Sequence, residues 1–412
     1  MIDIKLIRDQ ADLIKSFVTR KKGNPARVDE AKALDEKRRQ LLIEAESLRA
    51  KRNQLTKDDV EMGKQIKAHL KDIEPELKKI EDDLSLVMRQ IPNIILDDVP
   101  TGKDDSDNKV LRKWGTPKKF SFPVKDHLQL GESLGVIDVE TAGKVSGPRF
   151  TYLKGDLALM EFALVQFALN KLSQKGFVPV VPPVMIKPEI YIKMARLDPG
   201  QEEERYFMPN DDLYLIGSAE HTLGPLHMDE IINQNDLPKR YVGFSTCFRR
   251  EAGSYGKDTR GILRVHQFDK VEMESFTTAA DGAQEQELMV SIQEELMQEL
   301  GLPYHVVIVC TGDMGGPDAR QYDIETWIPS ENKYRETHSA DYMTDYQSRR
   351  LNTRAKLSDG KVELVHMNDA TVLAIGRTLI AIMENYQNAD GTITIPEVLR
   401  PIMGKDKITS RI

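Results

Sequence analysis

The sequence predicts an α+β protein in two parts: an antiparallel helical hairpin over residues 28–91, then an antiparallel β-sheet domain flanked by helices. Three observations predict this fold class. Leucines recur every seventh residue in a stretch with almost no aromatic residue and little glycine or proline. The composition changes sharply near residue 100. Beyond that point, several short β-like segments are grouped around a few longer helical ones.

The hairpin is predicted from two apolar seams, separated by the turn-forming residues TKDDVEMG at 56–63. Such a narrow seam is buried only against another helix of the same kind. A hairpin within one chain and a coiled coil between two chains satisfy the periodicity equally well. The seam residues are Leu34, Leu41, Leu48 and Leu55, then Leu70, Leu77, Leu84 and Ile91, interleaved with Ile73, Ile80 and Val87.

Pro75 lies inside the second seam. A proline within a helix removes one backbone hydrogen bond and costs about 3 kcal/mol. We therefore expect a bend at Pro75 or a helix that restarts near Glu74.

A polar linker, DDVPTGKDDSDNKV, follows the hairpin at 97–110. We expect a first domain over residues 1–105 and a second over 106–412. Helices are predicted at 156–175, 281–300 and 373–388. Strands are predicted at 177–186 (interrupted by Pro182 and Pro183), 213–217, 241–248, 264–275, 304–310 and 321–328.

Composition narrows the class of protein. The net charge of −8 over 412 residues argues against a surface coated with bases for indiscriminate nucleic-acid binding. Cys247 and Cys310 are too few for a disulfide framework or a Cys-rich zinc site, and the eight histidines include no H-E-x-x-H pair, so we expect no zinc.

No apolar stretch approaches the roughly 18–20 residues of a membrane span. The first residues carry Asp3, Asp9 and Asp12, and they are typical of the start of a folded protein rather than of a signal peptide. We expect a cytoplasmic protein without a membrane partner.

The most informative stretch runs from Phe244 to Phe276. Arg249 and Glu251 alternate on the first β-like segment, and on the second Phe268 shares one face with Lys270, Glu272 and Glu274. The loop between them carries Gly253, Gly256, Lys257, Arg260, Gly261 and Arg264. An arginine fork with an aromatic ring fits an anionic ligand that contains a base, but a salt-bridged hairpin with a solvated loop fits the composition as well. The sequence has no G-x-x-x-x-G-K-[ST] and no strand-linked G-x-G-x-x-G.

The run FRREAGSYGKDTRGILRVHQFDKVEM at 248–273 resembles motif 2 of the class II aminoacyl-tRNA synthetases, in the form typical of the seryl-tRNA synthetase family. Residues 374–403 resemble motif 3, and FVPVVPPVM at 177–185 with its preceding helix resembles motif 1. YRETHSADYMTDYQSRR at 334–350 and the helical hairpin fit the same family. The resemblance implies a class II antiparallel catalytic sheet with an N-terminal tRNA-binding arm, and a homodimer formed through motif 1.

The resemblance also implies the reaction and the ATP site. The enzyme would condense L-serine with ATP to seryl-adenylate, then transfer the seryl group to tRNA(Ser), and to tRNA(Sec) as well. Arg249 would hold the α-phosphate and the serine carboxylate, Phe268 would stack on the adenine, and Glu251 would contact it. Arg377 would cover the opposite face and the γ-phosphate, and Glu336 and Ser339 would hold Mg²⁺. The remaining implied ATP-site residues are Arg250, Arg264, Val265, Thr337 and His338.

The implied serine site comprises Ser218, Ala219, Glu220, Arg249, Glu272, Asp369 and Thr371. A pocket that pairs the serine hydroxyl rejects alanine, because its own polar groups are then left unsatisfied. Ser218 stands where the family has threonine. Asp369 falls where it has asparagine, so either Asp369 adds a negative charge beside the substrate or Asn368 takes that place by a register shift. The alternative function is therefore a synthetase paralogue with a different amino-acid or acceptor specificity.

The arm is shorter than in bacterial members of the family, and it is implied to grip tRNA through phosphates. The implied contacts are Arg49, Lys51, Arg52, Lys57, Lys64, Lys67 and Lys71. A solvated helical face explains the same charges. A non-catalytic coiled-coil protein would explain residues 28–91 and nothing after them.

Overall fold

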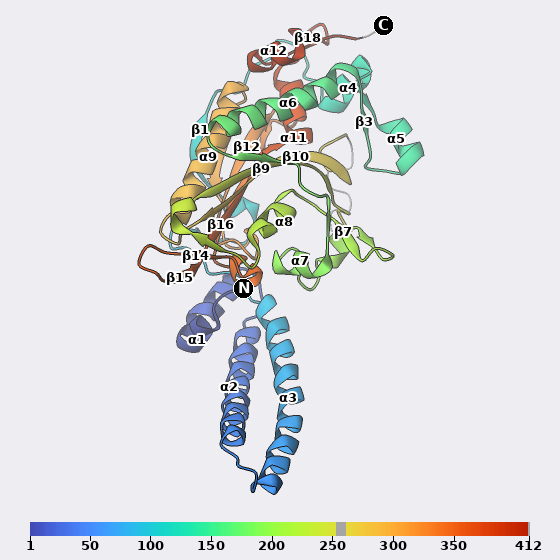
Figure 1. Ribbon diagram of the computed structural model, residues 1–412. Coiled ribbons are helices and arrows are strands. Elements are labelled where there is room, and N and C mark those ends of the chain that lie inside the picture. The colour runs from blue at the N-terminus through green and yellow to red at the C-terminus, as the bar shows by residue number, and fades with distance from the viewer. Residues whose placement is uncertain (253–260, 411–412) are drawn as a thin grey trace. The chain divides into compact units, whose positions relative to one another are not determined.

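The computed structural model describes residues 1–252 and 261–410. The chain divides into two compact units, Met1–Ile95 and Leu96–Ile412. Figure 1 shows the helices of the first unit in blue and the strands and helices of the second in the remaining colours. None of the helices in the described parts of the chain has the length and apolar character needed to cross a membrane.

The first unit is built from helices α1 (Ile4–Arg20), α2 (Ala26–Asn53) and α3 (Val60–Arg89). The apolar seam is buried within this single chain: Leu41, Leu48 and Leu55 of α2 and its turn pack against Ile66, Leu70 and Ile73 of α3 around Ala45. The turn is held by Asp59, whose carboxylate accepts hydrogen bonds from both the backbone N–H and the hydroxyl of Thr56 at 2.7 Å. The seam therefore forms a hairpin, as one of the two readings predicted.

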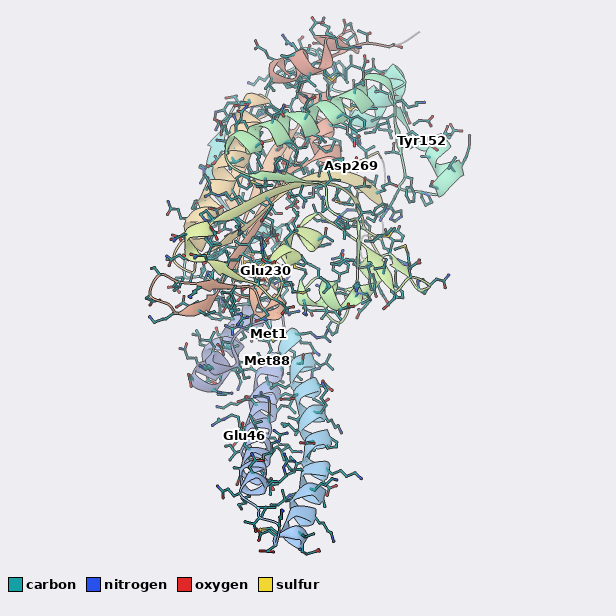
Figure 2. All side chains as sticks on the ribbon, in the orientation of Figure 1. Met1, Glu46, Met88, Tyr152, Glu230 and Asp269 are labelled. Atoms are coloured by element: carbon teal, nitrogen blue, oxygen red, sulfur yellow. The ribbon has the colours of Figure 1, made fainter. Side chains whose placement is uncertain are left out.

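The charged residues of the hairpin lie on its outside. Figure 2 shows the side chains of α2 and α3, Glu46 among them, projecting away from the hairpin. Helix α1 is joined to α2 by Arg8, whose guanidinium donates to both oxygens of Asp35 at 2.5 and 2.7 Å.

Helix α3 runs unbroken from Val60 to Arg89, so the expectation that it restarts near Glu74 is wrong. Pro75 and Lys71, whose carbonyl loses its hydrogen bond, both lie on the exposed face. Water can solvate that carbonyl, while Ile73 and Leu77 on either side of the proline remain buried in the hairpin.

The second unit contains an eight-stranded sheet in the order β1-β11-β12-β13-β16-β10-β9-β4. Every neighbouring pair is antiparallel except β4–β9, which is parallel. The strands are β1 (Lys109–Trp114), β4 (Val178–Val180), β9 (Lys239–Phe248), β10 (Gln267–Thr277), β11 (Tyr304–Ile308), β12 (Arg320–Ile328), β13 (Lys333–Thr344) and β16 (His366–Ala374).

One face of this sheet is covered by helices α6 (Gly155–Gln174), α9 (Gly282–Glu299) and α11 (Ile375–Asn385) (Figure 1). The strand residues in this core alternate along the chain, for example Val271 and Met273 of β10. The opposite face therefore carries Lys270, Glu272 and Glu274, which agrees with the prediction that these three side chains share one face.

Shorter elements complete the unit. The other helices are α4 (His127–Leu134), α5 (Val139–Ser146), α7 (Pro188–Lys193), α8 (Glu220–Leu223), α10 (Ser348–Leu351) and α12 (Arg400–Met403). Small sheets join β2 (Ile137–Asp138) to β3 (Tyr152–Leu153), β5 (Met185–Ile186) and β6 (Phe207–Met208) to β7 (Leu213–Leu215), β8 (Ile231–Asn233) and β15 (Val362–Leu364) to β14 (Arg354–Lys356), and β17 (Ile393–Thr394) to β18 (Lys407–Ile408). Six 3-10 turns within the described residues are η1 (Asp105–Asp107), η2 (Glu202–Glu204), η3 (Gly224–His227), η4 (Gln234–Asp236), η5 (Pro329–Glu331) and η6 (Glu397–Leu399).

The predicted α+β class with an antiparallel sheet and a helical arm is confirmed. Helices α6 and α9 lie where the sequence places them, but α11 begins only at Ile375, because the strand β16 occupies the residues before it. The longest strand, β13, was not predicted from its pattern. Its sequence KYRETHSADYMT mixes charged residues into both faces, and a bulge at Thr337, opposite Ile324 and Glu325 of β12, interrupts the alternation.

The division between Ile95 and Leu96 lies ahead of the expected boundary at 105/106. The linker belongs to the second unit because its backbone forms hydrogen bonds with residues of that unit. The Leu96 N–H donates to the Ala319 carbonyl at 3.1 Å. Further along, the Asn108 side chain accepts from the Cys310 N–H at 2.8 Å.

Candidate active site

A pocket with about 690 Å³ of empty volume opens on the sheet face that the helices leave free. Strands β10, β13 and β16, the segment after β9 and the start of α11 supply its walls. Ten of the residues implied by the family resemblance line it: Arg249, Glu251, Arg264, Val265, Phe268, Glu336, Thr337, Ser339, Thr371 and Arg377.

Arg249 is fixed from two sides. Strand β9 ends at Phe248, but the Arg249 N–H still donates to the His266 carbonyl at 3.0 Å, and His266 Nδ1 donates back to the Arg249 carbonyl at 3.0 Å. Its side chain donates from Nε to the Gly217 carbonyl at 3.1 Å, and the guanidinium carbon lies 5.3 Å from the centre of the Phe268 ring. This is cation–π distance, so the ring holds the arginine over the sheet.

Glu251 does not alternate with Arg249 on a strand, so that prediction is wrong. The strand has already ended, and Glu251 has the left-handed backbone φ of 52°. This turn carries its carboxylate to Arg264, whose guanidinium donates to it at 2.7 Å. Both side chains still reach the pocket. The expected loop bases Lys257 and Arg260, with Gly253 and Gly256, lie outside the described residues.

Glu336 and Arg377 form an ion pair at the pocket wall. Arg377 donates from one guanidinium nitrogen to the Glu336 carboxylate at 3.1 Å and to its carbonyl at 3.0 Å. The Glu336 side chain is 53% exposed. Desolvation would raise the pKa of Glu336, but the positive charges of Arg377, Arg249 and Lys270 together outweigh it and lower that pKa. Glu336 and Ser339 thus offer an ionised carboxylate and a hydroxyl, which are oxygen ligands that suit Mg²⁺.

Two of the implied ATP-site residues do not line this pocket. Arg250 is exposed, with its guanidinium 5.7 Å from the centre of the Tyr206 ring. His338 is buried opposite Ile324, on the face covered by helices, and its Nδ1 is 2.8 Å from the hydroxyl of Thr337. Burial lowers the pKa of His338 to about 3, so its ring is neutral.

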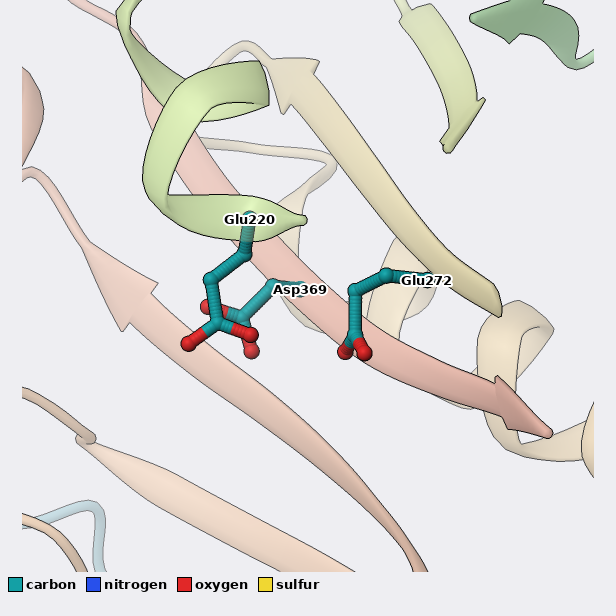
Figure 3. A group of neighbouring side chains, drawn as sticks. All are labelled: Glu220, Glu272 and Asp369. Atoms are coloured by element: carbon teal, nitrogen blue, oxygen red, sulfur yellow. The ribbon is translucent and has the colours of Figure 1, made fainter. Parts of the chain in front are cut away.

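A buried acidic group adjoins the pocket through Lys270 and Thr371. Carboxylate oxygens of Glu220, Glu272 and Asp369 lie within 4.8 Å of one another (Figure 3). Glu220 begins α8, and the pairing of Glu272 with Thr371 and of Glu274 with Asp369 brings β10 and β16 together here.

The side chains of this acidic group are joined by hydrogen bonds. The Ser218 hydroxyl lies 2.7 Å from Glu220 and 3.3 Å from Glu272, and it accepts from Lys270 Nζ at 3.2 Å. Lys270 also forms an ion pair with Glu272. Ala219 is fully buried ahead of α8.

The strand register decides whether Asn368 or Asp369 faces the acidic group. Asp369 pairs with Glu274 and Asp341 and shares their face of the sheet, whereas Asn368 pairs with Ser275 and Tyr342 on the other face. The pairing continues without interruption from Glu272 to Thr277, so no register shift places Asn368 in the pocket.

The protonation of these acids follows from burial and from two cations, Arg196 and Lys270. Burial would raise the pKa of Glu220, but the charge of Arg196, helped by His221 and Lys270, holds it well below the usual range. Burial and the charge of Glu220 hold the pKa of Asp369 well above the usual range. Burial raises the pKa of Glu272 to about 7, although the charge of Lys270 opposes this rise.

Lys270 was noted in the sequence but not assigned to the site, and Arg196 was missed altogether. Arg196 forms an ion pair with Glu220 at 3.0 Å and donates a hydrogen bond to Asp369 at 3.2 Å. It lies in an irregular segment after α7 that carries no recognisable pattern. Only a prediction of the chain path could have found it.

The implied arm residues are brought to one end of the hairpin. Arg49, Lys51 and Arg52 lie on the last turns of α2, and Lys57 lies in the turn. Lys64, Lys67 and Lys71 lie on the first turns of α3. All seven are exposed, and among the described residues only Arg49, with Glu74, and Lys64, with Glu61, form ion pairs.

Comparison with known proteins agrees with this architecture. Residues 204–386 match the family model of the tRNA synthetase class II core domain (G, H, P, S and T), and residues 1–95 match that of the seryl-tRNA synthetase N-terminal domain. A serine–tRNA ligase of Fervidobacterium nodosum is 43% identical over 99% of both chains.

Two solved structures resemble the whole chain. The seryl-tRNA synthetase of Pyrococcus horikoshii complexed with ATP has a TM-score of 0.95 and 37% identity, covering 100% of both chains. The cytoplasmic serine–tRNA ligase of Naegleria fowleri in complex with AMP has a TM-score of 0.90 and 33% identity, covering 100% of this chain and 99% of that one.

The catalytic unit is thus that of a class II aminoacyl-tRNA synthetase. With its helical arm, the chain belongs to the seryl-tRNA synthetase family and is an ATP-dependent ligase.

Proposed function

We propose that this serine–tRNA ligase binds ATP in the large pocket and L-serine in the adjoining acidic group. The observation that carries this proposal is the position of Arg249. Its side chain contacts Phe268 in the pocket and also the Gly217 carbonyl, which immediately precedes Ser218 of the acidic group. One guanidinium therefore stands between the two subsites.

The first half-reaction is an in-line attack of the serine carboxylate on the α-phosphorus of ATP. It requires the two anions to be aligned and their charge neutralised. Arg249 does both by donating to the carboxylate and to the α-phosphate. Phe268 stacks on the adenine, Glu251 and the backbone near Val265 contact it, and Arg377 pairs with the γ-phosphate. The proposed ATP site also includes Arg264 and Thr337, which line the pocket, and Arg250 and His338, which do not.

Glu336 and Ser339 would hold Mg²⁺ on the phosphates. The ion would supply further charge neutralisation. For this, Arg377 must exchange part of its pairing with Glu336 for the γ-phosphate. The ionised, half-exposed carboxylate of Glu336 supports this assignment.

In the acidic group, the serine ammonium is placed beside Glu220 and Ser218. Ala219, the buried residue between them, forms the adjoining backbone. The serine hydroxyl is placed between Glu272 and Thr371. Alanine would leave those groups unpaired, and the additional methyl of threonine would not fit. Asp369 lies behind Glu220, where it shapes the electrostatics of the ammonium site.

The second half-reaction uses the arm. Its seven exposed bases are placed on the phosphates of tRNA(Ser), and of tRNA(Sec) as a second acceptor. Their position at one end of the hairpin, mostly without ion-pair partners among the described residues, supports this.

The enzyme is proposed to act as a homodimer through motif 1. Apolar side chains on α6 and beside β4 are exposed in the single chain, with Phe162 at 64% and Val181 at 86%. Leu159 on the same helix is 51% exposed, and apolar side chains grouped in this way, rather than scattered singly, are typical of a surface that a partner covers. We place the enzyme in the cytoplasm, where its two cysteines would remain free thiols.

The test is ATP–pyrophosphate exchange with serine, threonine, alanine and glycine offered separately. Serine should support exchange at low concentration, and the others only weakly. A clear preference for another amino acid would replace serine as the substrate. That outcome is the alternative that Asp369 raises.

A further inference from the structure

The acidic group contains a pairing that the proposed reaction does not use. One guanidinium nitrogen of Arg196 forms an ion pair with Glu220 Oε1 at 3.0 Å and donates a hydrogen bond to Asp369 Oδ2 at 3.2 Å. Asp369 is almost fully buried, and Glu220 is buried as well. Arg196 therefore links the residue proposed to bind the ammonium with the aspartate that stands in place of the family's asparagine.

The backbone that delivers Arg196 is strained and firmly held. Helix α7 ends at Lys193, and the buried Ala195 adopts a left-handed φ of 57° directly before Arg196. A residue with a Cβ adopts this conformation at a cost of about 1–2 kcal/mol. The helix end is anchored by Gln347, which donates to the Met194 carbonyl at 3.0 Å. The surrounding structure therefore maintains the turn that directs Arg196 into the acidic group.

The contacts of Glu220 show what Arg196 does there. Arg196 occupies Oε1, which also lies 3.5 Å from His221 Nε2. The other oxygen, Oε2, faces the Ser218 hydroxyl at 2.7 Å and Lys270 at 3.9 Å. Arg196 thus holds Oε1 of Glu220 in place, and Oε2 remains directed toward the proposed ammonium site.

We infer that Arg196 is a positioning residue for amino-acid binding, which holds Glu220 ionised and oriented beside the buried carboxyl group of Asp369. The inference rests on the proposed binding of an amino acid at Glu220. Arg196 contacts both carboxyl groups, so the proton of this buried acid pair stays on Asp369 rather than on Glu220.

Without Arg196, two buried carboxyls would face each other with no cation between them, and such a pair retains a shared proton. The charged and titratable groups around it are Glu220 and His221 from α8, Lys270, Glu272 and Glu274 from β10, Asp341 from β13, Asp369 from β16, and Arg205, Arg249 and Asp318 from the loops. Of the described neighbours that then remain within 4 Å of the Glu220 carboxylate, His221 is neutral because burial lowers its pKa to about 3, and Lys270 is already paired with Glu272.

The experiment is ATP–pyrophosphate exchange with the full-length protein, with serine varied at pH 6.5 to 8.5. Arg196→Met should raise the KM for serine about 30- to 100-fold, with the KM for ATP within about twofold of wild type, because ATP does not contact Glu220. The ratio of variant to wild-type KM for serine should fall about tenfold as the pH rises, because the shared proton leaves Glu220.

A second set of variants changes Asp369 as well. Arg196→Met combined with Asp369→Asn should recover at least tenfold of the lost affinity and lose most of the pH dependence, because the second carboxyl is gone. Arg196→Lys keeps a positive charge and should fall between wild type and Arg196→Met. If Arg196→Met does not fold, the double variant and Arg196→Lys decide the question.

Arg240→Met is the matched control. Arg240 pairs with the buried Glu285 through two bonds of 2.6 and 2.7 Å, away from the acidic group. This variant should lower the melting temperature and leave the KM for serine and its pH profile at wild-type values.

A KM for serine within threefold of wild type in Arg196→Met, a pH-independent ratio, or no recovery in the double variant would overturn the inference. If wild-type protein activates an amino acid other than serine, the proposed substrate fails. The Arg196 effect would then be measured with that amino acid, since every α-amino acid carries the ammonium.

Discussion

Arg249→Ala removes the side chain that stands between the proposed ATP and serine subsites. Two charge-assisted hydrogen bonds, one to the α-phosphate and one to the serine carboxylate, would be lost in the transition state. Each contributes about 1.5–3 kcal/mol, so their combined loss of about 3–6 kcal/mol lowers kcat/KM by roughly 10²–10⁴-fold. The cation–π contact with Phe268, at 5.3 Å, adds less than either bond.

The assay is serine-dependent ATP–pyrophosphate exchange, with kcat and KM determined for both substrates. Most of the loss should appear in kcat, because the carboxylate and the phosphate are brought together only as the reaction proceeds. Arg249→Lys keeps the charge without the planar fork, so it should recover part of the rate. Melting temperature is the structural control, since Arg249 also donates to Gly217. A loss below tenfold in a correctly folded variant would refute the role given to Arg249.

Three further predictions follow from other parts of the chain. Changing Lys57, Lys64 and Lys67 together to Glu should raise the KM for tRNA at least tenfold and reduce its salt dependence, with pyrophosphate exchange unchanged. Glu272→Gln should make unfolding less dependent on pH: the pKa of Glu272 is about 7 in the folded protein against 4.5 ordinarily, so its contribution to stability is complete below pH 4.5 and is lost as the pH rises through 7. That difference corresponds to about 3 kcal/mol, measured by urea denaturation. Phe162→Asp should reduce the sedimenting mass from twice the chain mass to the single-chain 46.8 kDa.

A specific experimental result would contradict each of these three predictions. Charging that survives the arm substitutions would mean that the bases are only a solvated helical face. A wild-type unfolding curve with the same slope against pH as Glu272→Gln would mean that Glu272 is not the group that titrates. A dimer that persists with Asp at position 162 would place the interface elsewhere.

The fold was largely predictable where the periodicity was strong. The seven-residue repeats of the arm, the apolar run of α6 and the alternation along β10 each have one dominant period. Prediction failed at β13 and at the start of β16. There, polar residues of the pocket are inserted into strands, and bulges interrupt the alternation. The polar residues that line the pocket therefore interrupt the apolar alternation by which these strands could have been predicted.

The candidate site divides in the same way. Residues inside contiguous motifs, such as Arg249, Phe268 and Arg377, could be assigned from the sequence, and the structure brings them to one pocket. The sequence could not place Glu251, because a left-handed turn directs it. Arg250 and His338 lie in the same motifs, yet neither lines the pocket, because strand alternation and exposure separate them from it.

The sequence by itself determined that a helical arm precedes an antiparallel sheet, and it predicted which short motifs would meet at one pocket. These properties are encoded in local spacing, which is readable along the chain. The tertiary structure decided that the seam closes within one chain, that Asp369 rather than Asn368 joins Glu220 and Glu272 in the acidic group, and that Arg196 pairs with Asp369 across 173 residues. Such pairings depend on strand register and on the strained turn at Ala195, and both arise only when distant segments pack together.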